Sequence, residues 1–173
     1  IQLLLLNLVS DFPMIAIATD TVDKSELAKP KSYQTRDIVK MAIIFGLLST
    51  TFDLIMFALF YQRGAEILQT NWFIGSALTE LALIYSLRTK LPFWKALRPS
   101  WSLIALSVGG AALTVAIPFF AWGTSLFKFV TPSMADMRTI LFVVLMYFIT
   151  TEVGKLVYVK IEKKCLQKKL QKA

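Results

Sequence analysis

Long apolar runs separated by short polar segments dominate the pattern of this 173-residue chain. A helix needs roughly 20 apolar residues to cross the core of a bilayer, and most of the runs approach or exceed that length. We predict five membrane-spanning helices, at residues 1–18, 38–61, 72–87, 101–122 and 140–159. The third is short, which fits a helix surrounded by other helices better than one facing lipid. The pattern predicts an all-α polytopic membrane helix bundle over residues 1–160, followed by a basic tail over residues 161–173.

Composition supports this class, because 56% of the residues are hydrophobic and only 17% are charged. In soluble domains, about a quarter of all residues are charged. The net charge of +8 could indicate nucleic acid, but the basic residues lie between the apolar runs, so we expect the lipid bilayer as partner and no nucleic acid. The single cysteine, Cys165, excludes a disulfide within the chain, and the absence of histidine removes the commonest general base.

Basic residues gather in three alternate segments, at residues 19–40, 88–100 and 160–173, which hold most of the 19 lysines and arginines. Such segments face the cytoplasm in membrane proteins. We therefore expect a cytoplasmic C-terminus and, with five spans, an N-terminus on the outer side. Since the chain opens inside an apolar run, at Ile1, we also expect it to be a fragment of a longer protein.

Apart from Lys40, which belongs to the basic segment 19–40, five ionisable side chains fall within the predicted spans, where they are costly and usually mark ion pathways or buried pairs. Glu152 and Lys155 are three residues apart on one helix, so we expect them to neutralise each other. Asp53 follows a Ser-Thr-Thr stretch and lies nearer the outer face than the midplane, which favours an interhelical or loop-capping role over ion binding. The remaining two acids are Asp11 and Glu80.

Asp11 belongs to a cluster of oxygen-bearing side chains. Asn7, Ser10 and Asp11 have the spacing of one helical face, and Pro13 removes the amide that would bond the carbonyl of Val9. We therefore expect the first helix to be broken near Pro13. Carboxylate, amide and free carbonyl oxygens are the ligands of hard cations. A simple proline kink with a protonated Asp11 is the alternative.

Glu80 shares the depth of Asp11. Each lies about 12–13 Å from the basic end of its span at 1.5 Å per residue, close to the midplane. Two carboxylates at one level on different helices are what a coordination site requires. We predict a metal site formed by Asn7, Ser10, Asp11 and Glu80. The sequence has no Walker-type glycine loop and no nucleotide-binding βαβ unit, so the chain alone is not expected to hydrolyse ATP.

Several motifs resemble one family. The stretch Asn7-Leu8-Val9-Ser10-Asp11 resembles the sixth-helix cation-binding motif Asn-x-x-Thr/Tyr-Asp of P-type ATPases. Further stretches keep the order found in the bacterial magnesium-transporting branch: Ala18-Thr19-Asp20-Thr21-Val22-Asp23, Lys29-Pro30-Lys31, Phe45-Gly46-Leu47-Leu48-Ser49-Thr50-Thr51-Phe52-Asp53, Trp72-Phe73-Ile74 and Leu87-Arg88-Thr89-Lys90-Leu91-Pro92-Phe93.

This resemblance implies the sixth to tenth helices of a ten-helix cation pump in a prokaryotic plasma membrane. Asn7, Ser10 and Asp11 match its ligand positions, and Glu80 matches the eighth-helix acid of calcium-type pumps. The magnesium-type branch tends to have glutamine at the Glu80 position and tyrosine at that of Ser10. The overall resemblance implies Mg²⁺ as the cargo, and these two departures leave Ca²⁺ and Na⁺ open. ATP, its Mg²⁺, the phosphorylated aspartate and the earlier helices would belong to the parent protein.

Two other functions fit the residues alone. A non-enzymatic membrane accessory protein would use the buried acids to hold helices together. A free-standing cation channel or proton-coupled carrier would use them as a pathway.

Overall fold

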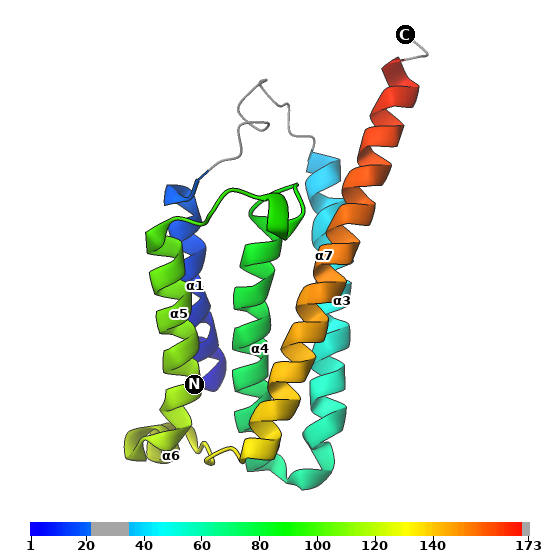
Figure 1. Ribbon diagram of the computed structural model, residues 1–173. Coiled ribbons are helices and arrows are strands. Elements are labelled where there is room, and N and C mark those ends of the chain that lie inside the picture. The colour runs from blue at the N-terminus through cyan, green and yellow to red at the C-terminus, as the bar shows by residue number, and fades with distance from the viewer. Residues whose placement is uncertain (22–34, 171–173) are drawn as a thin grey trace.

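Helices fill this computed structural model, which describes residues 1–21 and 35–170 (Figure 1). No strand occurs in those two ranges, so the all-α prediction is confirmed. The α-helices are α1 (Gln2–Ala16), α3 (Thr35–Phe60), α4 (Ala65–Leu87), α5 (Trp101–Ala116), α6 (Ala121–Phe127) and α7 (Met134–Leu170). Short 3-10 turns follow or precede them, at η1 (Ile17–Thr19), η2 (Tyr61–Arg63), η3 (Phe93–Lys95) and η4 (Ile117–Phe119).

Within the part of the chain that the structure describes, four segments are long and apolar enough to cross a membrane: Gln2–Thr19, Ile38–Arg63, Trp101–Phe119 and Met134–Glu162. The other predicted span, 72–87, lies in α4. This helix begins seven residues before the predicted span, and it is not apolar enough to be counted with the other four. α4 lies in the middle of the bundle and contacts α1, α3, α5 and α7 (Figure 1). A helix enclosed by protein can carry buried polar residues such as Thr70 and Ser86, which explains its lower hydropathy.

The predicted break at Pro13 is not present, because α1 runs without interruption from Gln2 to Ala16. Packing against α5 accounts for the difference. A side chain on Gly110 would come within 3.4 Å of the Val9 carbonyl oxygen and 3.9 Å of the Pro13 ring. α5 therefore lies directly against the turn that has lost its hydrogen bond. Neighbouring helices commonly support proline in membrane helices in this way.

The last helix is longer than predicted at both ends. α7 begins at Met134 and continues to Leu170, through most of the segment predicted as a separate tail. The rest of that tail, 171–173, and residues 22–34 of the first basic segment lie outside the described residues. The motif Lys29-Pro30-Lys31 falls within that first gap. The short helix α6 was not predicted, since its seven residues fall within and after the apolar run 101–122.

The apolar core lies toward one end of the bundle, where α1, α3, α4 and α7 meet. Its largest cluster of buried residues comprises Leu6, Met56, Phe60, Phe73, Ile74, Ala77, Ile117, Phe129, Ile140 and Val143. The ring centroids of Phe73 and Phe129 lie 4.8 Å apart within it. Most of this end is therefore held by apolar and aromatic contacts. We call it the opposite end, because it lies opposite the end of the bundle that carries the basic 88–100 segment.

Ion pairs hold the other end of the bundle, which we call the basic end. It comprises the 88–100 segment, the residues after η1, and α7 near Glu162. The predicted pairing of Glu152 with Lys155 is confirmed at 2.8 Å, with side chains 7% and 1% exposed. Glu152 also accepts hydrogen bonds from the Phe93 backbone N–H, at 2.6 Å, and from Ser86, at 2.9 Å. Lys155 donates to the Ser86 carbonyl at 2.8 Å. These bonds attach α7 to α4 and to the segment that follows α4.

Removing the Glu152 charge should therefore destabilise the bundle strongly. We expect Glu152→Gln to cost about 3 kcal/mol of unfolding free energy, because it leaves the Lys155 ammonium buried without a counter-charge. Unfolding in detergent micelles, followed by circular dichroism, measures this loss. The matched control is Glu162→Gln: Glu162 pairs with Lys90 at 3.1 Å, but both side chains are well exposed, at 37% and 42%. That change should cost less than about 1 kcal/mol. Equal losses of unfolding free energy in the two variants would show that the buried Glu152–Lys155 pair contributes no more than the exposed one.

Candidate functional site

A polar contact between α1 and α4 lies in the interior of the bundle. Ser10 is buried, and its hydroxyl lies close to the backbone carbonyl oxygens of Leu6, at 3.1 Å, and Asn7, at 3.2 Å. The Glu80 carboxylate of α4 lies within interaction distance of the same hydroxyl. Glu80 itself is half-buried. The structure therefore brings together two of the four predicted ligand residues, one from each helix.

The other two predicted ligands lie beside this contact. Asn7 and Asp11 are exposed, and within the described part of the chain neither side chain makes a hydrogen bond. Asp11 is nevertheless close enough to Glu80 for their charges to interact. The separation follows from helix geometry, since consecutive residues point about 100° apart and Ser10 takes the inward direction. Asn7 and Asp11 thus form an open face of α1 next to a half-buried acid.

Asp53 lies closer to this site than its predicted depth suggests. The Ser76 hydroxyl of α4 donates a hydrogen bond to the Asp53 carboxylate of α3, at 2.8 Å, so the expected interhelical role is confirmed. Ser76 is one helical turn before Glu80, and the charges of Asp53 and Glu80 interact. Sequence reasoning missed Ser76, although its four-residue spacing from Glu80 places both on one face of α4.

A tyrosine from the last helix completes the polar interior. The hydroxyl groups of Tyr147 on α7 and Ser49 on α3 are 2.7 Å apart and share a hydrogen bond. Tyr147 is almost fully buried and lies near enough to feel the charges of Asp53 and Glu80. Its ring packs edge-on against Phe52, with ring centroids 5.2 Å apart. Polar groups from α1, α3, α4 and α7 therefore converge around the middle of α4.

The donor set is chemically suited to a hard cation but incomplete. It offers hydroxyl and carboxylate oxygens from Ser10, Glu80 and Asp11, the types that Mg²⁺ and Ca²⁺ prefer. Among the described residues, no group of three or more histidine, cysteine, aspartate or glutamate side chains is arranged to hold a metal ion. The remaining ligands of a cation here would have to come from water or from other protein segments.

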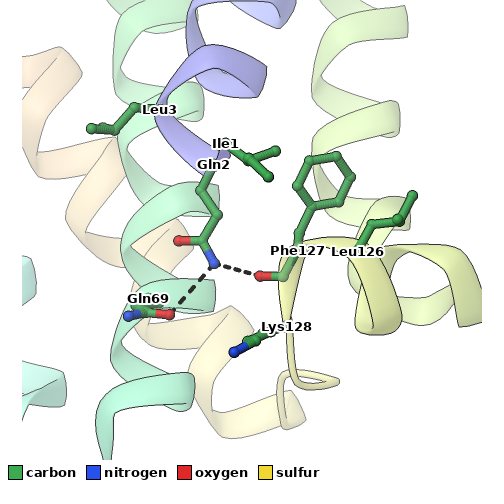
Figure 2. A pocket seen from close by; sticks show the side chains of 7 residues that line it. All are labelled: Ile1, Gln2, Leu3, Gln69, Leu126, Phe127 and Lys128. Carbon is green, nitrogen blue, oxygen red and sulfur yellow. Dashed lines mark hydrogen bonds between the residues drawn. The ribbon is translucent and has the colours of Figure 1, made fainter.

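Two cavities lie at the opposite end, away from Glu80. The larger, about 380 Å³, is open and lies between the start of α1, α4 and the end of α6 (Figure 2). Figure 2 shows the Gln2 amide donating to the Phe127 carbonyl, at 2.5 Å, and to Gln69, at 3.4 Å. Gln69 is eleven residues before Glu80 on α4, or about 16 Å along the helix. This cavity is therefore separate from the Ser10–Glu80 contact.

The smaller cavity, about 150 Å³, lies between the start of α4 and the start of α7. Asn71 lines it and is 1% exposed, and neither its amide nitrogen nor its amide oxygen has a hydrogen-bond partner among the described residues. The ion pair of Arg63 with Asp136 forms part of the same wall. A polar cavity of this size has room for ordered water, which would supply the missing partners of Asn71.

The Ser76–Asp53 bond gives a direct test of this geometry. We expect Ser76→Ala to cost about 1 kcal/mol of unfolding free energy, within the range measured for hydrogen bonds between membrane helices. Thr79→Val is the control, because the Thr79 hydroxyl bonds the Ser76 carbonyl of its own helix, at 2.9 Å, and no other group among the described residues. Unfolding in detergent compares the two variants. If both have the same small effect, α3 and α4 are not joined at this point.

Comparison with known proteins places these residues in context. The sequence profile of the family described as "Cation transporting ATPase, C-terminus" matches residues 1–157. Proteins named "Magnesium-transporting ATPase, P-type 1" from Salmonella typhimurium (strain LT2) and Escherichia coli (strain K12) are each 30% identical over 127 residues. Each alignment covers 69% of this chain and 14% of the relative. The chain therefore spans only a small part of the length of these relatives.

Proposed function

The chain belongs to the P-type cation-transporting ATPase family, whose C-terminal membrane domain it represents, and on that basis we propose that it supplies part of the intramembrane cation site of an ATP-driven pump. The contact of Ser10 on α1 with Glu80 on α4, within electrostatic reach of Asp11, is the observation that carries this proposal. Asn7, Ser10, Asp11 and Glu80 would be the ligands from this chain.

The open face of α1 suits this role. Asn7 and Asp11 are exposed on the side that the other described helices leave uncovered. Helices of the parent protein would cover that face and add the missing ligands. Pro13 leaves the Val9 carbonyl without its helical hydrogen bond, so a further opening of α1 would make that oxygen available.

We propose Mg²⁺ as the transported ion, because the relatives named above are magnesium-transporting ATPases. Mg²⁺ keeps several waters and is bound through one or two carboxylates, which agrees with a donor set of two acids, a hydroxyl and an amide. Oxygen ligands alone do not distinguish Mg²⁺ from Ca²⁺, so ion dependence must be measured directly.

The proposed mechanism is alternating access driven by ATP. Phosphorylation in the ATP-handling domains of the parent protein would change the packing of the membrane helices and expose the site to one side and then to the other. The basic end would face the cytoplasm of a prokaryotic cell, since the 88–100 segment carries four basic residues and no acid.

Asp11 provides the first test. In the full-length ATPase, we expect Asp11→Asn to abolish the cation dependence of phosphorylation while expression stays at the wild-type level, because one of two nearby charges that would neutralise the cation is lost. Phosphoenzyme formation across a cation titration measures this. Glu66→Gln is the control, since Glu66 is exposed in the first turn of α4. Normal cation-stimulated turnover in the Asp11 variant would remove Asp11 from the site.

Glu80 provides the second test, through selectivity. We expect Glu80→Gln to raise the half-saturating cation concentration, by about tenfold or more, because one charged ligand becomes neutral. ATPase activity measured against Mg²⁺ and separately against Ca²⁺ would show whether the two curves move by different amounts. Unchanged curves for both ions would make Glu80 a structural residue.

A further inference from the structure

α1 and α4 run in the same direction and meet at two levels. In the interior, Ser10 of α1 contacts Glu80 of α4. At the basic end, Asp20, which directly follows η1, contacts Arg88, which directly follows α4. Arg88 is eight residues after Glu80, or about 12 Å along the helix, and Asp20 is ten residues after Ser10. The second contact therefore lies about two helical turns from the candidate cation site.

The contact at the basic end is a closed network of hydrogen bonds. The Arg88 guanidinium donates to the Asp20 carboxylate, at 2.6 Å, and to the Leu97 carbonyl, at 2.8 Å. The other Asp20 oxygen accepts from the Ser100 backbone N–H, at 2.7 Å. Ser100 in turn caps the start of α5. The ends of α1 and α4 and the start of α5 are thus joined through one carboxylate.

Burial makes this ion pair rigid. The side chains of Arg88 and Asp20 are only 3% and 5% exposed. Burial alone would raise the pKa of Asp20, but the hydrogen bonds from Arg88 and from the Ser100 backbone lower it below its ordinary value. Asp20 is therefore ionised at neutral pH. Because both charges are buried and bonded, any shift of α1 along α4 would leave them unpaired, which is costly.

The position of Pro13 shows why such a fixed end is needed. Pro13 lies between Ser10 and Asp20, and it removes one hydrogen bond from α1, the helix that carries Ser10 and leads to Asp20. A slip of one helical turn would move a side chain by about 5.4 Å, enough to separate Ser10 from Glu80. The Asp20–Arg88 pair fixes the end of α1 and thereby determines where along α4 Ser10 meets Glu80.

We propose that Asp20 and Arg88 are positioning residues that hold α1 and α4 in the register at which Ser10 meets Glu80, and so set the affinity of the cation site. This inference rests on the proposed function, because it acts through Glu80. Neither residue would touch the cation, since both lie about two turns from it.

The test is the cation dependence of ATPase activity in the full-length protein. We expect Asp20→Asn to raise the half-saturating Mg²⁺ concentration by about tenfold, at the lower end of the loss seen when groups supporting metal ligands are removed. The maximal rate per folded molecule should change much less. A purely structural role predicts the reverse: fewer folded molecules and a lower total rate at an unchanged half-saturating concentration.

A second variant keeps the test decisive if Asp20→Asn does not fold. Arg88→Lys keeps the positive charge beside Asp20 but loses the second donor that reaches Leu97. It should give a smaller shift in the same direction. The control is Glu162→Gln, which breaks the exposed pair with Lys90 at the same end and should leave the curve unchanged. An unchanged half-saturating concentration in both Asp20→Asn and Arg88→Lys, or in the one that folds, would overturn the proposal.

Glu80→Gln separates this proposal from the function it rests on. If Glu80→Gln moves the Mg²⁺ curve and the Asp20 and Arg88 variants do not, only the positioning role is wrong. If Glu80→Gln has no effect either, both the cation site and the positioning role are wrong.

Discussion

A polar side chain inside a membrane bundle must find its partner on another helix, because hydrocarbon offers none. This constraint explains the role of α4, which lies among α1, α3, α5 and α7 (Figure 1). Three of its polar residues meet a neighbouring helix: Ser76 meets Asp53, Glu80 meets Ser10, and Ser86 meets Glu152. Each of these three residues thus links α4 to one surrounding helix, and these contacts add to the apolar packing that holds the bundle together.

The two ends of the bundle differ in how their ion pairs are buried. The opposite end is packed mainly by apolar and aromatic side chains, and the arginine of its Arg63–Asp136 pair is 45% exposed. At the basic end, both partners are buried in the pairs of Asp20 with Arg88 and Glu152 with Lys155. Displacing a buried ion pair leaves its charges unpaired in a medium of low dielectric constant, so these two pairs oppose sliding of α1 or α7 along α4.

The sequence predicts what depends on local spacing and misses what depends on packing. The apolar runs predicted the helices, and the three-residue spacing predicted the Glu152–Lys155 pair. The pairing of Asp20 with Arg88 joins residues 68 positions apart, and no local pattern indicates it. The prediction of a break at Pro13 was wrong for the same reason, since α5 packs against that turn at Gly110. The polar start of α4 was missed because an apolar criterion does not recognise a helix enclosed by protein.

In the candidate site, too, local spacing predicted part of the arrangement and packing between helices decided the rest. Sequence spacing grouped Asn7, Ser10 and Asp11, and the structure turns only Ser10 toward Glu80. Asp11 remains on an uncovered face of a helix apolar enough to span a membrane. An acid facing hydrocarbon near the middle of a helix costs about 2.5–3.5 kcal/mol on insertion scales, while an acid that binds a cation between helices is neutralised. The exposure of Asp11 is therefore explained most simply if other helices cover this face in the working protein. That explanation agrees with a chain that spans 14% of the length of its relatives.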